Sequence, residues 1–214
     1  LTRVPIPVVA ALDGDARGAA TTLALWSDAT VSYLTTALGC PGAMAGLVPL
    51  GALVALRVRS EARTSMLAAP LRAELGAAGA LATLLAAERV DSAHLGGTLG
   101  LLGDRWLVTV DRDGLLETAA DLARALARGV PERPLASRKT FAEVGQITTA
   151  SSLLAELDPT ARSVVEVLAR ALRSAGTVED LLRAERAAVI ELLTQPAIRE
   201  KAAATLQALS APRR

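Results

Sequence analysis

One stretch near the start of the chain decides the fold: Val8-Val9-Ala10-Ala11-Leu12-Asp13-Gly14-Asp15-Ala16-Arg17-Gly18-Ala19-Ala20-Thr21-Thr22-Leu23-Ala24-Leu25-Trp26. The apolar run 8–12 predicts a buried strand, Asp13-Gly14 predicts a turn, and the apolar residues up to Trp26 predict a helix. Residues 29–34 are rich in β-branched side chains and predict a second strand. Since a strand-helix-strand unit implies parallel strands joined by a right-handed crossover, the sequence predicts an α/β fold.

The corner where the first strand turns into the helix is a candidate anion site. The first N–H groups of a helix have no intrahelical acceptor, and the helix dipole favours negative charge beside them. Gly18, Ala19 and Ala20 carry almost no side chain, so a ligand oxygen could approach these peptide nitrogens closely. The alternative is that small residues only let the helix pack tightly on the strand. Taken alone, the corner favours this packing interpretation.

A longer pattern favours the anion site over the packing interpretation. Residues 10–28 resemble the signature of the crotonase superfamily, the enoyl-CoA hydratase and isomerase family. That signature is an apolar strand, Asn-Gly, three small glycines, Glu-Leu-Ala-Leu and an aspartate. The matching residues here are Asp13-Gly14, Gly18-Ala19-Ala20, Thr22-Leu23-Ala24-Leu25 and Asp28, followed without a gap by Pro41, Gly46 and Pro49. The resemblance implies a crotonase-like layered core of strands and helices (ββα-type) with C-terminal helices.

The same resemblance implies roles for residues at the corner. In that family two peptide N–H groups polarise a thioester carbonyl and stabilise the enolate formed beside it, and the second donor is the middle glycine of the three. That position is Ala19 here. Gly18, Ala20 and Pro41 are then implied as substrate-binding residues. The first donor would lie on a strand upstream of Leu1, so that part of the fold is expected outside this sequence.

Two departures from the family pattern bear on the reaction. Hydration of an enoyl thioester needs a carboxylate to activate water and an acid to protonate the α carbon. The hydratase glutamates fall on Thr22 and Gly42 here. Threonine is neither acid nor base near neutral pH, although it can orient a water or bind a ligand, and glycine offers only backbone. The resemblance therefore implies a decarboxylase or isomerase rather than a hydratase.

Three functions stay open at this point. The first is an enzyme acting on an acyl thioester of CoA or of an acyl carrier protein, in polyketide or other secondary metabolism, with no cofactor beyond the CoA or phosphopantetheine of the substrate. The second is a non-catalytic crotonase-fold protein with a binding or assembly role. The third is a nucleotide-binding α/β domain, which is disfavoured because Gly14 and Gly18 match neither the dinucleotide fingerprint nor the phosphate loop.

Composition excludes several classes of partner. Aromatic residues make up 2% of the 214-residue chain, which leaves little surface for stacking nucleobases. The net charge of +1 argues against nucleic acid or an anionic membrane as the main partner. The longest apolar run, from Cys40 to Leu56, is too short for a membrane span and contains Pro41 and Pro49. No secretory signal is visible, so the expected location is cytoplasmic.

The single cysteine and single histidine are predicted to be structural. One cysteine cannot form an intrachain disulfide, which fits a reducing compartment. Cys40 is interpreted as a buried small residue and His94 as a helix-surface or interface residue, since they lie far apart in the sequence. No metal site is expected, because cysteine and histidine are too few to supply the ligands.

The rest of the chain predicts helices around this core. Residues 115–128 predict a helix with one apolar stripe, formed by Leu115, Leu116, Ala119, Leu122, Ala123 and Leu126. Asp158-Pro159, Thr177-Val178-Glu179-Asp180 and Pro196 each predict the start of a C-terminal helix. We predict a crotonase-like core over residues 1–139 and a helical region over residues 140–214. Family resemblance implies a homo-oligomer, most simply a trimer, built with the C-terminal helices.

Overall fold

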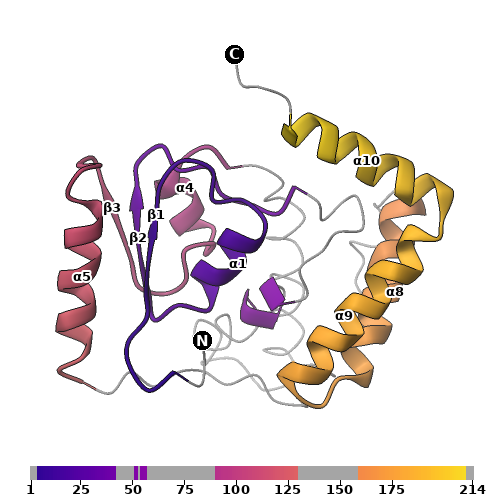
Figure 1. Cartoon of the computed structure of the whole chain (residues 1–214), viewed down its shortest axis with the longest axis horizontal. Coiled ribbons are helices and arrows are strands. Elements are labelled where there is room, and N and C mark those ends of the chain that lie inside the picture. The colour runs from indigo at the N-terminus through magenta and orange to yellow at the C-terminus, as the bar shows by residue number, and fades with distance from the viewer. Residues whose placement is uncertain (1–3, 42–50, 53, 57–89, 130–158, 211–214) are drawn as a thin grey trace. The chain divides into compact units, whose positions relative to one another are not determined.

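The structure of this protein is a computed structural model that describes residues 4–41, 51–52, 54–56, 90–129 and 159–210 (Figure 1). The chain divides into two compact units. The first unit comprises Leu1–Cys40 and Arg89–Leu135, and the second comprises Pro41–Glu88 and Ala136–Arg214. The boundary predicted between residues 139 and 140 lies outside the described residues, so it stays a prediction.

The first unit contains a three-stranded parallel sheet (Figure 1). Its strands are β1 (Val9–Leu12), β2 (Ala29–Tyr33) and β3 (Trp106–Thr109), in the order β1-β2-β3. Val9 pairs with Ala29, and Thr30 pairs with Trp106. The parallel pairing of the first two strands and the α/β class are therefore confirmed.

Helices cover both faces of this sheet. Helix α5 (Leu115–Leu126) lies on one face, and the short helices α1 (Ala19–Leu25) and α4 (Ala93–Thr98) lie on the other (Figure 1). Val31 at the centre of β2 packs against Leu115 and Ala119 of α5, with Val9, Ala11 and Leu122 at the margin of the cluster. Because a parallel sheet is covered on both faces, β2 is buried along almost its whole length.

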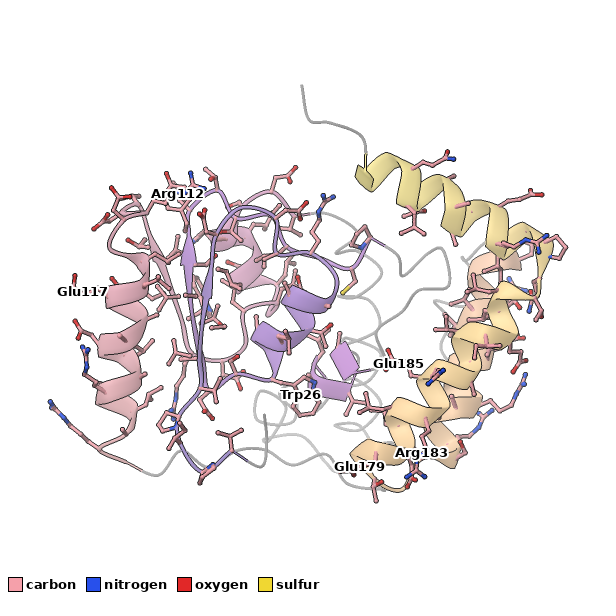
Figure 2. The ribbon with its side chains drawn as sticks, in the orientation of Figure 1. Trp26, Arg112, Glu117, Glu179, Arg183 and Glu185 are labelled. Carbon is pink, nitrogen blue, oxygen red and sulfur yellow. The ribbon has the colours of Figure 1, made fainter. Side chains whose placement is uncertain are left out.

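The apolar stripe predicted for α5 is wrong at one position. Leu115 and Ala119 are buried and Leu122 packs beside them, which is the spacing of one helix face. Leu116, however, is 73% exposed. It lies one residue, or about 100°, round the helix from Leu115, and the sheet contacts only a narrow face of α5. Figure 2 shows Glu117, the next residue, on the side of α5 away from the sheet.

Helix α4 approaches its neighbours closely because it contains two glycines. A Cβ atom at Gly97 would lie 2.6 Å from the ring of Trp106, and one at Gly96 would clash with Leu38. Ser92 caps the helix by accepting a hydrogen bond from the Leu95 N–H at 3.4 Å. These contacts seat α4 beside β3 and the segment that follows β2.

The described part of the second unit is mainly helical. Its long helices are α8 (Pro159–Ser174), α9 (Val178–Leu193) and α10 (Pro196–Ser210), as predicted from their proline and capping signals. Asp158, the predicted N-cap of the first of these, lies outside the described residues. Helices α8 and α9 lie side by side (Figure 1) and bury Val164, Val165, Val167, Ala169, Leu181, Ala188 and Leu192.

The predicted capping box at the start of α9 is confirmed. The Thr177 hydroxyl accepts from the Asp180 N–H at 3.1 Å, and the Asp180 carboxylate accepts from the Thr177 N–H at 3.1 Å. The hydrogen bond from the Thr177 side chain, with further bonds from backbone N–H groups, lowers the pKa of Asp180 below its ordinary value. Among the described residues, no helix is long and apolar enough to cross a membrane.

Candidate functional site

The corner between β1 and α1 depends on two glycines with positive φ. Gly14 has φ 69°, and Gly18, the N-cap of α1, has φ 66° and ψ −119°. A Cβ atom at either position would meet nothing within 4 Å, so backbone conformation rather than space requires glycine there. The Gly18 angles let the chain turn into helix immediately, which makes Ala19 the first helical residue.

The segment after β2 runs beside the corner and holds it. The Ala37 N–H donates to the Gly14 carbonyl at 2.8 Å, and the Ala16 N–H donates to the Ala37 carbonyl at 2.9 Å. The Gly18 N–H donates to the Gly39 carbonyl at 2.7 Å. The parallel pairing of β1 and β2 thus continues past their ends, up to the residue before Ala19.

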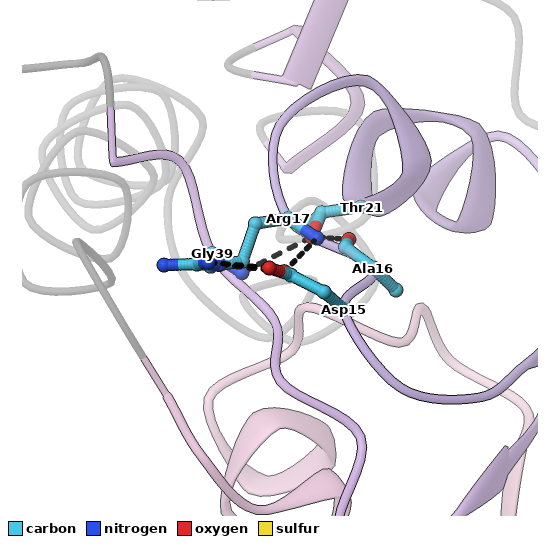
Figure 3. A network of polar contacts seen from close by, with 5 residues as sticks. All are labelled: Asp15, Ala16, Arg17, Thr21 and Gly39. Atoms are coloured by element: carbon cyan, nitrogen blue, oxygen red, sulfur yellow. Dashed lines mark hydrogen bonds and ion pairs between the residues drawn. The ribbon is translucent and has the colours of Figure 1, made fainter. Parts of the chain in front are cut away.

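The Thr21 side chain adds a second connection between the same two segments (Figure 3). Its hydroxyl donates to the Ala16 carbonyl at 2.7 Å and accepts from the Gly39 N–H at 3.1 Å. Thr21 is fully buried. Since the hydroxyl both donates and accepts, its main hydrogen-bonding capacity is used inside the protein.

Asp15 and Arg17 form an ion pair in the turn that leads into α1 (Figure 3). The Arg17 Nε donates to Asp15 Oδ1 at 2.6 Å, the guanidinium also contacts Oδ2, and the Arg17 backbone N–H reaches Oδ1 at 3.4 Å. The Arg17 side chain is only 12% exposed. The hydrogen bond to Asp15 raises the pKa of Arg17 despite the opposing effect of burial, and Asp91 adds to the attraction.

Ala19 and Ala20 present free peptide N–H groups, as predicted. Within the part of the chain that the structure describes, neither N–H has an acceptor, whereas the Thr22 N–H bonds to the Gly18 carbonyl at 3.1 Å. Ala19 is exposed. The structure therefore brings Gly18, Ala19 and Ala20 together on one turn, where the N–H groups of Ala19 and Ala20 have no acceptor among the described residues.

Thr22 lies on the same turn, but its hydroxyl proton bonds locally. The hydroxyl donates to the Gly18 carbonyl at 3.2 Å, four residues back. Its oxygen can still accept a hydrogen bond. Gly42, the other predicted acid/base position, lies outside the described residues. Pro41 is half-buried and belongs to the second unit.

Cys40 and His94 lie where the sequence predicts them, one buried and the other on a helix surface. Cys40 is 1% exposed, and burial raises the pKa of its thiol to about 11, so the thiol is neutral at pH 7. His94 is exposed on α4, with its ring edge-on to Trp106 at 5.7 Å between centroids. In the described ranges, no cluster of three or more His, Cys, Asp or Glu side chains could hold a metal ion.

Sequence reasoning missed the polar residues that hold the corner. Arg17 and Asp15 are two residues apart, a spacing that a turn can close into an ion pair, so their pairing had a local signal. The bond between Thr21 and Gly39 joins residues 18 positions apart and had none. A third cluster lies at the carboxyl ends of the strands, where the Arg112 Nε donates to Asp13 Oδ2 at 2.7 Å over the Tyr33 ring (Figure 2).

Comparison with known proteins finds similarity to enoyl-CoA hydratases. The chain is 32% identical over 166 residues to the "Probable enoyl-CoA hydratase EchA17" of Mycobacterium tuberculosis H37Rv, a match that covers 78% of this chain and 55% of the relative. The same protein of Mycobacterium bovis matches equally. The chain thus spans about half the length of these curated relatives. No family model matches the chain.

The solved structures found in the comparison have lower sequence identity. One is an enoyl-CoA hydratase subunit of Geobacillus kaustophilus HTA426, with 23% identity and a TM-score of 0.42, covering 100% of this chain and 64% of that one. Another is OdaA of Pseudomonas aeruginosa, with 24% identity and a TM-score of 0.40, covering 85% of this chain and 63% of that one.

Proposed function

Because this chain belongs to the crotonase superfamily, we propose that it binds an acyl thioester and stabilises an enolate of that thioester through the N–H of Ala19. One observation carries the proposal: the 32% identity to enoyl-CoA hydratases over 166 residues. The N–H of Ala19 supports it, because it has no acceptor among the described residues and an oxyanion needs donors that the protein does not already use. The thioester is that of CoA or of an acyl carrier protein.

The proposed reaction is decarboxylation or isomerisation rather than hydration. In decarboxylation the bond from the α carbon to the carboxylate breaks, its electron pair moves into the thioester as an enolate, and carbon dioxide leaves. No base is needed to start this step. Thr22 fits this reaction better than hydration, since its hydroxyl already donates to Gly18 and cannot act as an acid near pH 7. Substrates from polyketide or other secondary metabolism are the proposed source.

The proposed assembly is a homo-oligomer, most simply a trimer. In α9, Leu182 is 58% exposed and Ile190 is 57% exposed. They are eight residues apart, about 80° around the helix, whereas Leu181, Ala188 and Leu192 on the other side of the helix are buried. Two separate exposed apolar side chains do not mark an interface by themselves, so the trimer is proposed from the family resemblance. The mass in solution, measured by light scattering at micromolar concentration, tests this, and a single-chain mass would contradict it.

A non-catalytic binding role is the second candidate. It is favoured by the chemistry of the corner, where Asp15 is paired with Arg17 and the Thr22 hydroxyl donates to Gly18. Under this alternative the chain would bind acyl-CoA without turning it over.

The experiment uses acetoacetyl-CoA, whose enolate absorbs in the near ultraviolet, as a probe for the purified chain. We expect binding to increase the enolate absorbance. Ala19→Pro removes the N–H and should reduce turnover of a carboxyacyl-CoA about 100-fold, by analogy with the loss of one oxyanion donor. Proline is well tolerated at the first position of a helix, which is where Ala19 lies, so this variant should fold. Ala19→Gly keeps the N–H and is the matched control.

The outcomes separate the two candidates. Malonyl-CoA decarboxylation that Ala19→Pro reduces about 100-fold and Ala19→Gly retains supports the enzyme. Binding of acetoacetyl-CoA with neither enolate signal nor decarboxylation supports the binding role. We expect no hydration of crotonyl-CoA above background, and efficient hydration would contradict the roles assigned to Thr22 and Gly42.

A further inference from the structure

We propose that Thr21 is a positioning residue for the enolate site: its hydroxyl ties the Gly39 N–H to the Ala16 carbonyl and so fixes the direction of the Ala19 N–H. The inference rests on the proposed function, because it assigns a task to a residue that would support the Ala19 donor. Thr21 itself is fully buried, and its hydroxyl bonds to Ala16 and Gly39 (Figure 3), so the role assigned to it is positioning rather than contact with the substrate.

The Thr21 hydroxyl uses both its donor and its acceptor capacity within the protein. The hydroxyl donates to Ala16 at 2.7 Å and accepts from Gly39 at 3.1 Å, and the side chain has no exposed surface. Removal of the hydroxyl would leave a buried carbonyl and a buried N–H without their partner. Such groups stay unsatisfied unless the backbone moves to find another partner. Movement of Ala16 or Gly39 is thus the expected response to the loss of this hydroxyl.

Gly39 links the Thr21 hydroxyl to Gly18, the residue before Ala19. Both backbone polar groups of Gly39 are hydrogen-bonded. Its N–H donates to the Thr21 hydroxyl, and its carbonyl accepts from the Gly18 N–H at 2.7 Å. Gly18 therefore follows any movement of Gly39. The Gly18 carbonyl and the Ala19 N–H belong to one planar peptide group, so a tilt of that plane redirects the donor.

The peptide group between Gly18 and Ala19 is also held by hydrogen bonds from helix α1. The Gly18 carbonyl accepts from the Thr22 N–H at 3.1 Å and from the Thr22 hydroxyl at 3.2 Å. Since carbonyl and N–H point in opposite directions across a trans peptide, these bonds turn the Ala19 N–H away from the helix. Thr21 and Thr22 thus hold the donor from two sides, and of these two side chains Thr21 is the one that bonds to the segment after β2.

The test compares Thr21→Val, which has nearly the shape of threonine without its hydroxyl, with Thr21→Ser, which keeps the hydroxyl. Acetoacetyl-CoA is the probe, and each variant is measured for probe affinity by calorimetry and for the enolate fraction of bound probe by near-ultraviolet absorbance. We expect Thr21→Val to lower the enolate fraction about tenfold with less than a threefold change in affinity. Thr21→Ser should retain the parent signal. A merely structural role would not lower enolisation while sparing affinity.

Each variant is first checked for correct folding. Circular dichroism checks the fold of each variant, and Thr21→Ala, which adds no volume, replaces Thr21→Val if the latter does not fold. An unchanged enolate fraction in the variant without the hydroxyl would overturn the inference and leave the proposed function standing. An equal loss in Thr21→Ser would also overturn it. A parent chain that binds the probe without forming enolate would overturn the proposed enolate chemistry and the inference with it.

Discussion

The β1–α1 corner and the pair of helices α8 and α9 place their polar contacts in opposite environments. At the corner, Thr21 is fully buried and Arg17 is 12% exposed, and both are hydrogen-bonded. Between the two helices, the Arg170 to Glu191 ion pair at 3.0 Å leaves its side chains 63% and 49% exposed. There the buried contact is apolar, with Val164, Leu181 and Leu192 almost fully enclosed.

The two regions therefore differ in the interactions that determine their stability and their geometry. Apolar contacts stabilise in proportion to buried area but have little directional preference, which suits a helix pair whose task is to pack. Hydrogen bonds have strict geometry and are costly to leave unmade when buried, which suits a turn that must aim a peptide group. The corner is thus specified by polar bonds, and the helix pair by apolar burial.

The largest expected effect is the loss of stability on truncating a buried apolar side chain of α9. Leu192→Ala should lower the free energy of unfolding by roughly 2–5 kcal/mol, because Leu192 is fully buried and its truncation leaves a cavity. Urea unfolding followed by circular dichroism measures this. Leu182→Ala on the same helix is the control and should cost less than about 0.5 kcal/mol, since that side chain is 58% exposed. Equal losses for both variants would contradict the packing of α9.

A smaller effect is expected from the backbone of the corner. Gly18→Ala places a Cβ on a residue with φ 66° and ψ −119°, which should cost about 1–3 kcal/mol of stability. Gly129→Ala is the matched control, because that glycine also has open space around it but no positive φ. Thermal unfolding of the two variants compares them. A Gly18→Ala variant as stable as the control would mean that the corner needs no glycine.

The smallest effect concerns the exposed ion pair. Separate replacement of Arg170 and Glu191 by Met and Gln should each change stability by less than about 1 kcal/mol, because both side chains are largely solvated. The coupling energy from a double-mutant cycle should likewise be about 0.5 kcal/mol or less. Raising the salt concentration should weaken it further. A coupling above about 2 kcal/mol would show that polar contacts also determine how these helices pair.

Features that depend on near neighbours along the chain could be predicted from the sequence. The capping box of Thr177 and Asp180 spans three residues, and the strand-helix-strand order from Val9 to Tyr33 follows from periodicity and turn residues, so both were predicted correctly. The small-residue turn at Gly18 and Ala19 was also visible, because free N–H groups at the start of a helix follow from helix geometry alone.

The burial of individual side chains, and their contacts with residues distant in the sequence, follow from the tertiary fold and could not be predicted. Leu116 fits an apolar helix stripe as well as Leu115 does, but the sheet covers one of them and leaves the other 73% exposed. Thr21 is unremarkable in a run of small residues until the segment after β2 brings the Gly39 N–H to its hydroxyl. The physical reason is that burial and long-range hydrogen bonds depend on which segments the fold places side by side, whereas caps and turns depend only on residues within about four positions along the chain.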